Sequence, residues 1–330
     1  MPIHDSSAPA VVVGDLVREF KGGIRAVDGL GLEVAAGEIY GFLGPNGAGK
    51  TTVVRILTTL LRPTSGRALV AGHDVVRAGD EVRRMIGVAL QEAAIDPLMT
   101  GRELLRMQGA LHGLRGGEAR DRAKVLLERV GLTDAADRRV GGYSGGMRRR
   151  LDLALGLVHR PRVLFLDEPT TGLDPTSRAA LWREVRALND DGTTVFLTTQ
   201  YLEEAEQLAD RVGIIARGTL MAEGTPDDLK ARVGEPTVHV ELADAASAER
   251  ARAALERVGR LEPASGSAPC RVALRAAAGT GAIAPVVRAL DEHGVEVVTV
   301  ELETPSLDDV FVAVTGSHLE GAGEPEEAVA

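Results

Sequence analysis

Short apolar runs alternate with helical patterns along most of the chain. Compact apolar runs lie at residues 39–43, 86–90, 163–166, 195–198 and 212–216, and residues 11–13 with Val17 and residues 24–34 also indicate strands. Runs of this length between turn residues are typical of strands buried in a mostly parallel sheet. Helical periodicity separates them, for example over residues 51–61 and 176–188. The alternation predicts an α/β fold.

Residues 100–139 interrupt this alternation with a helical pattern alone. They have charged faces and breaks at Gly116–Gly117 and Gly131. Glycine pairs inside a helical pattern favour a turn between helices. We therefore expect an inserted helical subdomain at about residues 100–150.

A second unit is expected from Glu235–Pro236 onward. Residues 237–242, 270–274 and 295–302 are strand-like, residues 246–258 and 283–293 are helical, and residues 263–269 are rich in turn residues. This order is compatible with a small α+β domain of ferredoxin-like type. The expected division is a flexible N-terminus at residues 1–9, a first domain at 10–234, a second at 235–316 and an acidic tail at 317–330.

Composition and charge exclude several classes of protein. The chain has 330 residues and a net charge of −10, which disfavours nucleic acid as the main ligand. Its longest stretch without Asp, Glu, Lys or Arg has 12 residues, whereas a membrane-spanning helix needs about 20 apolar residues. No signal-peptide pattern is present at the N-terminus. The single cysteine, Cys270, excludes an internal disulfide or a cysteine-rich zinc site.

A phosphate-binding loop is predicted between the apolar run at residues 39–43 and the helical run that follows it. The sequence G-P-N-G-A-G-K-T fits the pattern G-x-x-x-x-G-K-[ST] in the strand–loop–helix context that this motif requires. Backbone N–H groups and the helix N-terminus would surround the phosphates, with Lys50 on the β- and γ-phosphates and Thr51 on Mg²⁺. The residues expected to bind the nucleotide here are Gly44, Pro45, Asn46, Gly47, Ala48, Gly49, Lys50, Thr51 and Thr52.

Two carboxylates end the apolar run at residues 163–166. Burial of Asp167 and Glu168 beside apolar residues is costly unless they are paired or bind a metal. We expect Asp167 to hold Mg²⁺ and Glu168 to accept the proton of an attacking water. A solvated pair of acids at a strand end is the alternative, which the phosphate loop makes less favourable.

These motifs together resemble the ATP-binding cassette (ABC) ATPases over residues 10–230. Ser144, Gly145 and Gly146 resemble the signature loop, which in this family serves the ATP bound by the opposite subunit. Gln91 resembles the glutamine that in this family links metal and water to the membrane partner. Asp174 matches the position of the D-loop, and Phe20 matches the aromatic residue that stacks on adenine. The resemblance implies a P-loop NTPase fold with ATP and Mg²⁺ as cofactors. A core position for Phe20 is equally compatible with the sequence.

One position departs from the family pattern. Gln200 stands where the family usually has a switch histidine, and glutamine can donate and accept hydrogen bonds but carries no charge at neutral pH. We expect Gln200 to orient the water and the γ-phosphate while Glu168 acts as the base. Residues 199–205 and 305–311 are similar to the ATPase subunits of drug exporters of the daunorubicin-resistance type, in which glutamine at this position is usual.

The resemblance also implies partners and a location. It predicts a homodimer with ATP between two copies, polytopic membrane permease subunits, no nucleic acid, and the cytoplasmic face of the cell membrane. An importer, a non-transport ABC ATPase and a nucleotide-gated regulatory module with weak hydrolysis remain as alternatives. The substrate class expected for export is a drug, an antibiotic or another amphiphile.

Overall fold

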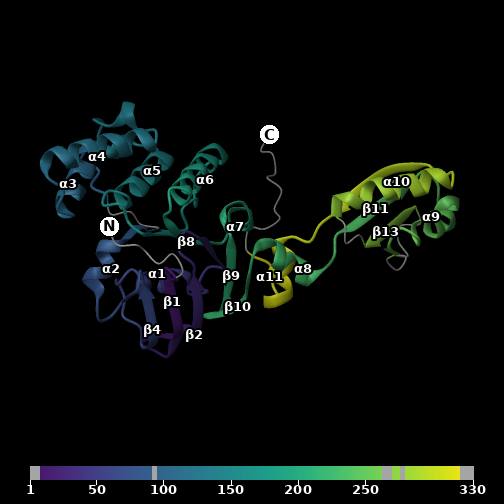
Figure 1. Ribbon diagram of the computed structural model, residues 1–330, viewed down its shortest axis with the longest axis horizontal. Coiled ribbons are helices and arrows are strands. Elements are labelled where there is room, and N and C mark those ends of the chain that lie inside the picture. The colour runs from purple at the N-terminus through teal and green to yellow at the C-terminus, as the bar shows by residue number, and fades with distance from the viewer. Residues whose placement is uncertain (1–7, 91–94, 262–269, 276–278, 320–330) are drawn as a thin grey trace. The chain divides into compact units, whose positions relative to one another are not determined.

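The computed structural model describes residues 8–90, 95–261, 270–275 and 279–319 (Figure 1). The chain forms two compact units, one of Met1–Pro226 with Val314–Ala330 and one of Asp227–Ala313. The expected domain boundaries at residues 10, 234 and 316 stay predictions. Most of the expected flexible N-terminus and of the acidic tail lies outside the described residues.

A six-stranded sheet forms the centre of the first unit. Its order is β10-β9-β3-β8-β7-β6, and every neighbouring pair is parallel except the pair of β9 and β10. The strands are β3 (Ile39–Leu43), β6 (Ile86–Ala89), β7 (Val163–Asp167), β8 (Thr194–Thr199), β9 (Arg211–Ala216) and β10 (Thr219–Gly224). Every residue of β3, β7 and β8 is buried, which explains why these strands are continuous apolar runs. The predicted α/β class is confirmed.

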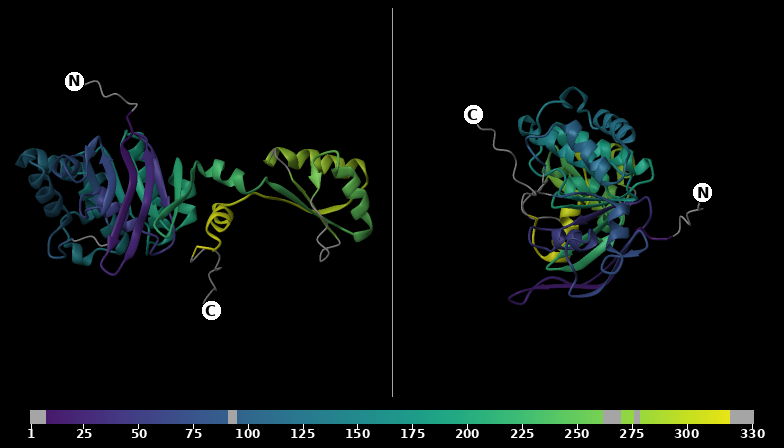
Figure 2. Two further views of the ribbon diagram at one scale, coloured as in Figure 1. Left: turned by 90° about the horizontal axis from the view of Figure 1, so that it is seen from below. Right: turned by 90° about the vertical axis from the view of Figure 1, so that its left-hand side faces the viewer.

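The two strands expected near the N-terminus belong to a separate antiparallel sheet. Its order is β2-β1-β4-β5, with β1 (Val11–Phe20), β2 (Ile24–Val34), β4 (Ser65–Val70) and β5 (His73–Asp74). Figure 2 shows β1 and β2 in purple, side by side along their length. Strands β1 and β2 were predicted, but β4 and β5 were not. The separation into a second sheet was not predicted either, because only the end of β2 alternates regularly between buried and exposed positions.

Helices cover the central sheet and form the expected insertion. Helix α1 (Lys50–Leu57) ends before the predicted residue 61, while α2 (Gly79–Met85), α6 (Pro175–Asp190) and α7 (Leu202–Leu208) connect strands. Helices α3 (Gly101–Leu111), α4 (Gly116–Arg129) and α5 (Gly145–Gly156) gather together in Figure 1 and share one apolar core. A capping box between Thr100 and Glu103 starts α3. The expected break at Gly116–Gly117 lies where α4 begins, after the turn at residues 112–113 that separates it from α3.

The second unit begins with α8 (Pro226–Val233) and contains the predicted α+β fold. Strands β11 (Thr237–Leu242), β12 (Arg260–Leu261), β13 (Arg271–Arg275) and β14 (Val297–Glu303) pair antiparallel in the order β12-β13-β11-β14. Helices α9 (Ala248–Leu255) and α10 (Ile283–Glu292) pack against this sheet and against each other. This is the split β-α-β arrangement of a ferredoxin-like domain. The predicted helix at 246–258 is shorter, because a 3₁₀ turn precedes α9.

The segment after β14 forms the helix α11 (Leu307–Thr315). Ser306 Oγ accepts a hydrogen bond from the Asp309 N–H at 3.2 Å, and Asp309 Oδ2 accepts one from the Ser306 N–H at 2.8 Å. This reciprocal cap fixes the helix start that the sequence indicates. Within the described residues, no helix has both the length and the apolar character needed to cross a membrane.

Candidate nucleotide-binding site

The phosphate loop links the buried strand β3 to α1. Gly49 has φ +107°, and a Cβ at this position would lie 2.2 Å from the Ala26 carbonyl oxygen, so only glycine fits. A Cβ at Gly44 would lie 2.4 Å from the Ile215 carbonyl oxygen. The close approach of neighbouring backbone thus determines two of the glycines in the motif.

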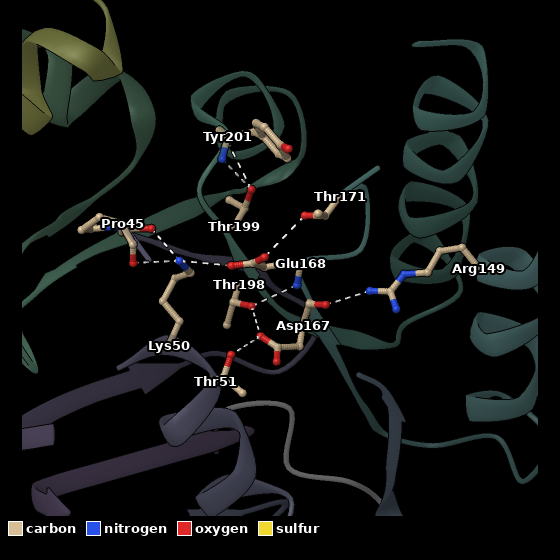
Figure 3. A network of polar contacts seen from close by, with 11 residues as sticks. Pro45, Lys50, Thr51, Arg149, Asp167, Glu168, Thr171, Thr198, Thr199 and Tyr201 are labelled. Carbon is tan, nitrogen blue, oxygen red and sulfur yellow. Dashed lines mark hydrogen bonds and ion pairs between the residues drawn. The ribbon is translucent and has the colours of Figure 1, made fainter. Parts of the chain in front are cut away.

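Lys50 is turned back over its own loop. Its Nζ donates hydrogen bonds to the carbonyl oxygens of Gly44 at 2.6 Å and Pro45 at 3.0 Å (Figure 3). It also forms an ion pair with Glu168 Oε1 at 3.3 Å, and the side chains are only 4% and 7% exposed. Burial lowers the pKa of Lys50, and the charges of Glu168 and Asp167 oppose this shift. The loop therefore holds a buried cation against the carboxylate at the end of β7.

Asp167 is fully buried at the end of β7 and meets two hydroxyl groups. Its Oδ1 accepts hydrogen bonds from Thr198 Oγ1 at 2.5 Å and from Thr51 Oγ1 at 3.3 Å. Its Oδ2 is buried and has no hydrogen-bond partner among the described residues. A buried carboxylate oxygen without a partner is costly, and carboxylate with hydroxyl oxygen is a donor set that suits Mg²⁺. Asp167 and Thr51 therefore fit a magnesium ion.

Glu168 has a strained backbone as well as a buried side chain. Its φ is +48°, in the left-handed region that residues other than glycine rarely adopt. Its N–H donates to the Thr198 carbonyl oxygen and to Thr198 Oγ1, both at 3.1 Å, and Thr171 Oγ1 donates to its Oε2 at 3.4 Å. Such strain persists only where the surroundings hold the residue in place, which is typical of functional sites.

A cavity of about 240 Å³ lies beside these groups. The residues that line it are Ala26, Pro45, Asn46, Gly47, Gly49, Lys50, Thr51, Thr52 and Glu168. Seven of the nine residues expected in the phosphate loop therefore line one cavity together with the expected base. Gly44 and Ala48 instead support the loop, since Gly44 O accepts from Lys50 and Ala48 O accepts from the Gly218 N–H at 3.0 Å.

The expected signature and D-loop residues cap two neighbouring helices. Ser144 Oγ accepts from the Met147 N–H at 3.2 Å at the start of α5, followed by Gly145 and Gly146. Asp174 accepts two hydrogen bonds from Ser177 at the start of α6, from its N–H at 2.9 Å and its hydroxyl at 2.6 Å. In the part of the chain that the structure describes, none of these expected residues lines the cavity beside Lys50.

Three further predicted residues have different outcomes. Gln200 is half-buried directly after β8, two positions beyond Thr198, which is the register partner of Asp167. Phe20 ends β1, is 38% exposed, and has the Arg18 guanidinium 4.6 Å from its ring centroid. Gln91 lies outside the described residues. The assignments of these side chains to water, adenine and metal stay predictions.

Sequence reasoning missed three residues at this site. Thr198 bridges Asp167 and the backbone of Glu168, Ala26 lines the cavity, and Arg149 reaches the backbone of Asp167 and Pro169. Thr198 could have been found only from the order of the sheet, because β8 must be placed next to β7. The other two come from distant segments and have no local pattern.

Asp152, on α5, is a buried carboxyl whose titration we expect to affect stability. Burial raises its pKa to about 7, although Arg149 Nη1 lies 3.4 Å from its Oδ2 and lowers it in part. Because the folded pKa is above that of the unfolded chain, the protonated carboxyl stabilises the fold at low pH, and this contribution is lost as the pH rises through about 7.

We expect Asp152→Asn to gain stability over the wild type as the pH rises from 4 to 8. The gain should be about 4 kcal/mol in the free energy of unfolding, measured by urea denaturation across this range. Asp121→Asn, at an exposed position of α4, is the matched control and should show no such trend. A constant difference between Asp152→Asn and the wild type at all pH values would contradict the expectation.

Both units of the chain match known families. Residues 27–171 match the family described as "ABC transporter", and residues 224–315 match the one described as "ATP-binding protein DrrA1-3-like, C-terminal domain". The chain is 51% identical to the daunorubicin resistance ATP-binding protein DrrA2 of Streptomyces coeruleorubidus, with 92% of this chain and 94% of that protein covered. It is 48% identical to the daunorubicin/doxorubicin resistance ATP-binding protein DrrA of Streptomyces peucetius, with 97% and 96% covered.

The fold of the first unit also matches solved structures. One is a dimeric ATP-binding cassette in a post-hydrolysis state bound to ADP and Pi. The match has a TM-score of 0.61 at 27% identity, and it covers 65% of this chain and 98% of that one.

Proposed function

We propose that this chain, which belongs to the ATP-binding proteins of ABC transporters of the daunorubicin-resistance type, binds ATP in the cavity beside Lys50. The chain is the ATPase subunit that powers a drug-resistance exporter. The observation that carries the site assignment is the cluster of Lys50, Glu168, Asp167 and Thr51, of which Lys50, Thr51 and Glu168 line one cavity. The predicted P-loop ATPase and its export role are confirmed, and import is not favoured.

ATP binding would begin with an exchange of partners at Lys50. In the structure its ammonium group bonds Gly44, Pro45 and Glu168. Phosphate oxygens would compete for this cation, since charge-assisted hydrogen bonds to phosphate contribute roughly 1.5–3 kcal/mol each. The exchange frees Glu168 from its ion pair at the moment when the base is needed.

The carboxylates would then divide the chemistry. Asp167 and the Thr51 hydroxyl would hold Mg²⁺, which when bound neutralises charge on the phosphates. Glu168, one residue beyond Asp167, would accept the proton of the water that attacks the γ-phosphate. Gln200 would orient that water and the γ-phosphate through its amide, and its position after β8 suits this role.

A complete site would need two copies of the chain. The cavity residues provide contacts for the phosphates on one side, while Ser144, Gly145, Gly146 and Asp174 lie at two helix starts elsewhere. A helix N-terminus favours an anion. We infer that the start of α5 in a second copy covers the γ-phosphate, so that ATP joins a head-to-tail homodimer.

The transport path would belong to polytopic membrane permease subunits. ATP is supplied in the cytoplasm, so the chain would act at the cytoplasmic face of the cell membrane. The relatives are named for resistance to daunorubicin and doxorubicin, so the proposed substrate is a drug of this kind, and another amphiphilic antibiotic fits the same assembly. Co-purification of the chain with a polytopic protein from native membranes tests this, and recovery without any membrane protein would count against it.

We expect Gln200→His to raise kcat for ATP hydrolysis by less than tenfold. If the Gln200 amide already orients the water, a histidine at this position adds little to the rate of hydrolysis. If the site instead lacks an essential proton carrier, the wild-type rate is already lowered by about 10²–10⁴, and histidine should restore it. Steady-state hydrolysis with Mg²⁺ measures this. A hundredfold gain would show that Gln200 is not a competent replacement, and absence of hydrolysis in the wild type would favour a nucleotide-gated regulatory module.

A further inference from the structure

Arg149 is a partly buried arginine on α5 that bonds three carbonyl groups in two other segments of backbone. Its Nη1 donates to the Leu90 carbonyl oxygen at 2.6 Å, its Nη2 to that of Asp167 at 2.8 Å and its Nε to that of Pro169 at 2.9 Å. The side chain is 12% exposed. The Leu90 residue directly precedes Gln91 in the sequence. One guanidinium group therefore joins α5 to the ends of β6 and β7.

Two of these carbonyl groups flank Glu168 on either side. The bond to the Asp167 carbonyl holds the peptide before the strained residue, and Thr198 accepts the hydrogen bond of the Glu168 N–H (Figure 3). The bond to the Pro169 carbonyl holds the second peptide after Glu168. A residue at φ +48° needs such fixed neighbours, because its backbone would otherwise relax to negative φ. The direction of the Glu168 side chain follows from this backbone.

We propose that Arg149 is a positioning residue for hydrolysis, which fixes the backbone of Glu168 and ties it to α5 and to the residue before Gln91. The proposal rests on the proposed role of Glu168 as the base. Arg149 acts through Glu168 and is not itself one of the residues that line the cavity.

The chemistry of the site requires arginine at this position. A guanidinium group presents several N–H donors in a rigid planar fork, and here its three nitrogens bond three different carbonyl groups. Lysine carries the same charge on one nitrogen at the end of a flexible chain. Lysine therefore cannot hold Asp167, Pro169 and Leu90 together.

The test compares Arg149→Gln and Arg149→Lys with the wild type. We expect kcat for ATP hydrolysis to fall about 30- to 100-fold in Arg149→Gln, because a displacement of about 1 Å at a reacting group costs about 10²-fold. The KM for ATP should change less than threefold, because Lys50 and the phosphate loop are untouched. Arg149→Lys should recover only a small part of the rate. Arg148→Gln, an exposed neighbour on α5, is the matched control and should keep the wild-type rate.

A double-mutant cycle with Glu168→Gln separates positioning from general damage. If Arg149 acts through Glu168, adding Arg149→Gln to Glu168→Gln should lower the residual kcat by less than twofold. The proposal is overturned if the full loss recurs in that background, or if Arg149→Gln alone stays within threefold of the wild type. If Arg149→Gln does not fold, Arg149→Lys replaces it both in the comparison with the wild type and in the double-mutant cycle, with the same criteria. Absence of hydrolysis in the wild type would instead refute the proposed function.

Discussion

Glu168→Gln is expected to lower kcat for ATP hydrolysis by about 10²–10⁴ while leaving ATP binding intact. The amide is isosteric with the carboxylate but cannot accept the proton of the attacking water. Lys50 loses its 3.3 Å ion pair yet keeps its bonds to Gly44 and Pro45, so the phosphate loop retains its shape. Steady-state hydrolysis and titration with a fluorescent ATP analogue measure the two effects separately.

The same variant is expected to accumulate as an ATP-bound dimer. Hydrolysis would normally break the contacts that ATP makes to both copies, and a variant that binds but does not hydrolyse should keep them. Size-exclusion chromatography with and without ATP shows the change in mass. Glu128→Gln, at an exposed position of α4, serves as the control and should hydrolyse ATP like the wild type. A Glu168→Gln protein that stays monomeric at saturating ATP would contradict the two-copy site.

The central fold could be predicted from the sequence because its strands are buried on both faces. Burial of every residue in β3, β7 and β8 makes each strand a compact apolar run, and the loops between them contain turn residues. The ferredoxin-like order of the second unit followed from strand and helix patterns in sequence.

Pairing across the chain could not be predicted in the same way. The antiparallel sheet brings Val11 to Val34 and to Val70, and no local pattern specifies that β4 joins the two early strands. Helix α1 ends at Leu57 although the apolar periodicity continues to Leu61, because Thr59 adopts φ +67°. Such a backbone reversal depends on tertiary contacts that periodicity does not contain.

The residues of the nucleotide site also divide into those that local sequence motifs predict and those that only the folded chain brings together. Motif spacing placed Lys50, Thr51, Asp167 and Glu168 together, because each motif comes at the carboxyl end of a buried strand and parallel strands share that edge. Thr198 and Arg149 reach the same carboxylates from β8 and α5, through a register and a helix contact that only the folded chain defines. The sequence therefore predicted the groups expected to react and missed the groups that hold them.

Lys50→Ala is expected to reduce both ATP affinity and stability, for two separable reasons. The variant loses the cation expected to bind the β- and γ-phosphates, and two lost charge-assisted hydrogen bonds correspond to at least a 100-fold rise in the Kd for ATP. It also leaves Glu168, which is 7% exposed, without its cation in a buried site. Removal of one partner of a buried ion pair costs about 3–5 kcal/mol, so the free energy of unfolding should fall by roughly this amount.

The double variant Lys50→Ala/Glu168→Gln separates the two effects. Because the neutral amide needs no cation, most of the lost stability should return, measured by urea denaturation without nucleotide. ATP affinity should stay as low as in Lys50→Ala, because the phosphate-binding cation is still absent. If the double variant is no more stable than Lys50→Ala, the buried ion pair is not what Lys50 contributes to the fold. If Lys50→Ala binds ATP within threefold of the wild type, the nucleotide does not bind at this cavity.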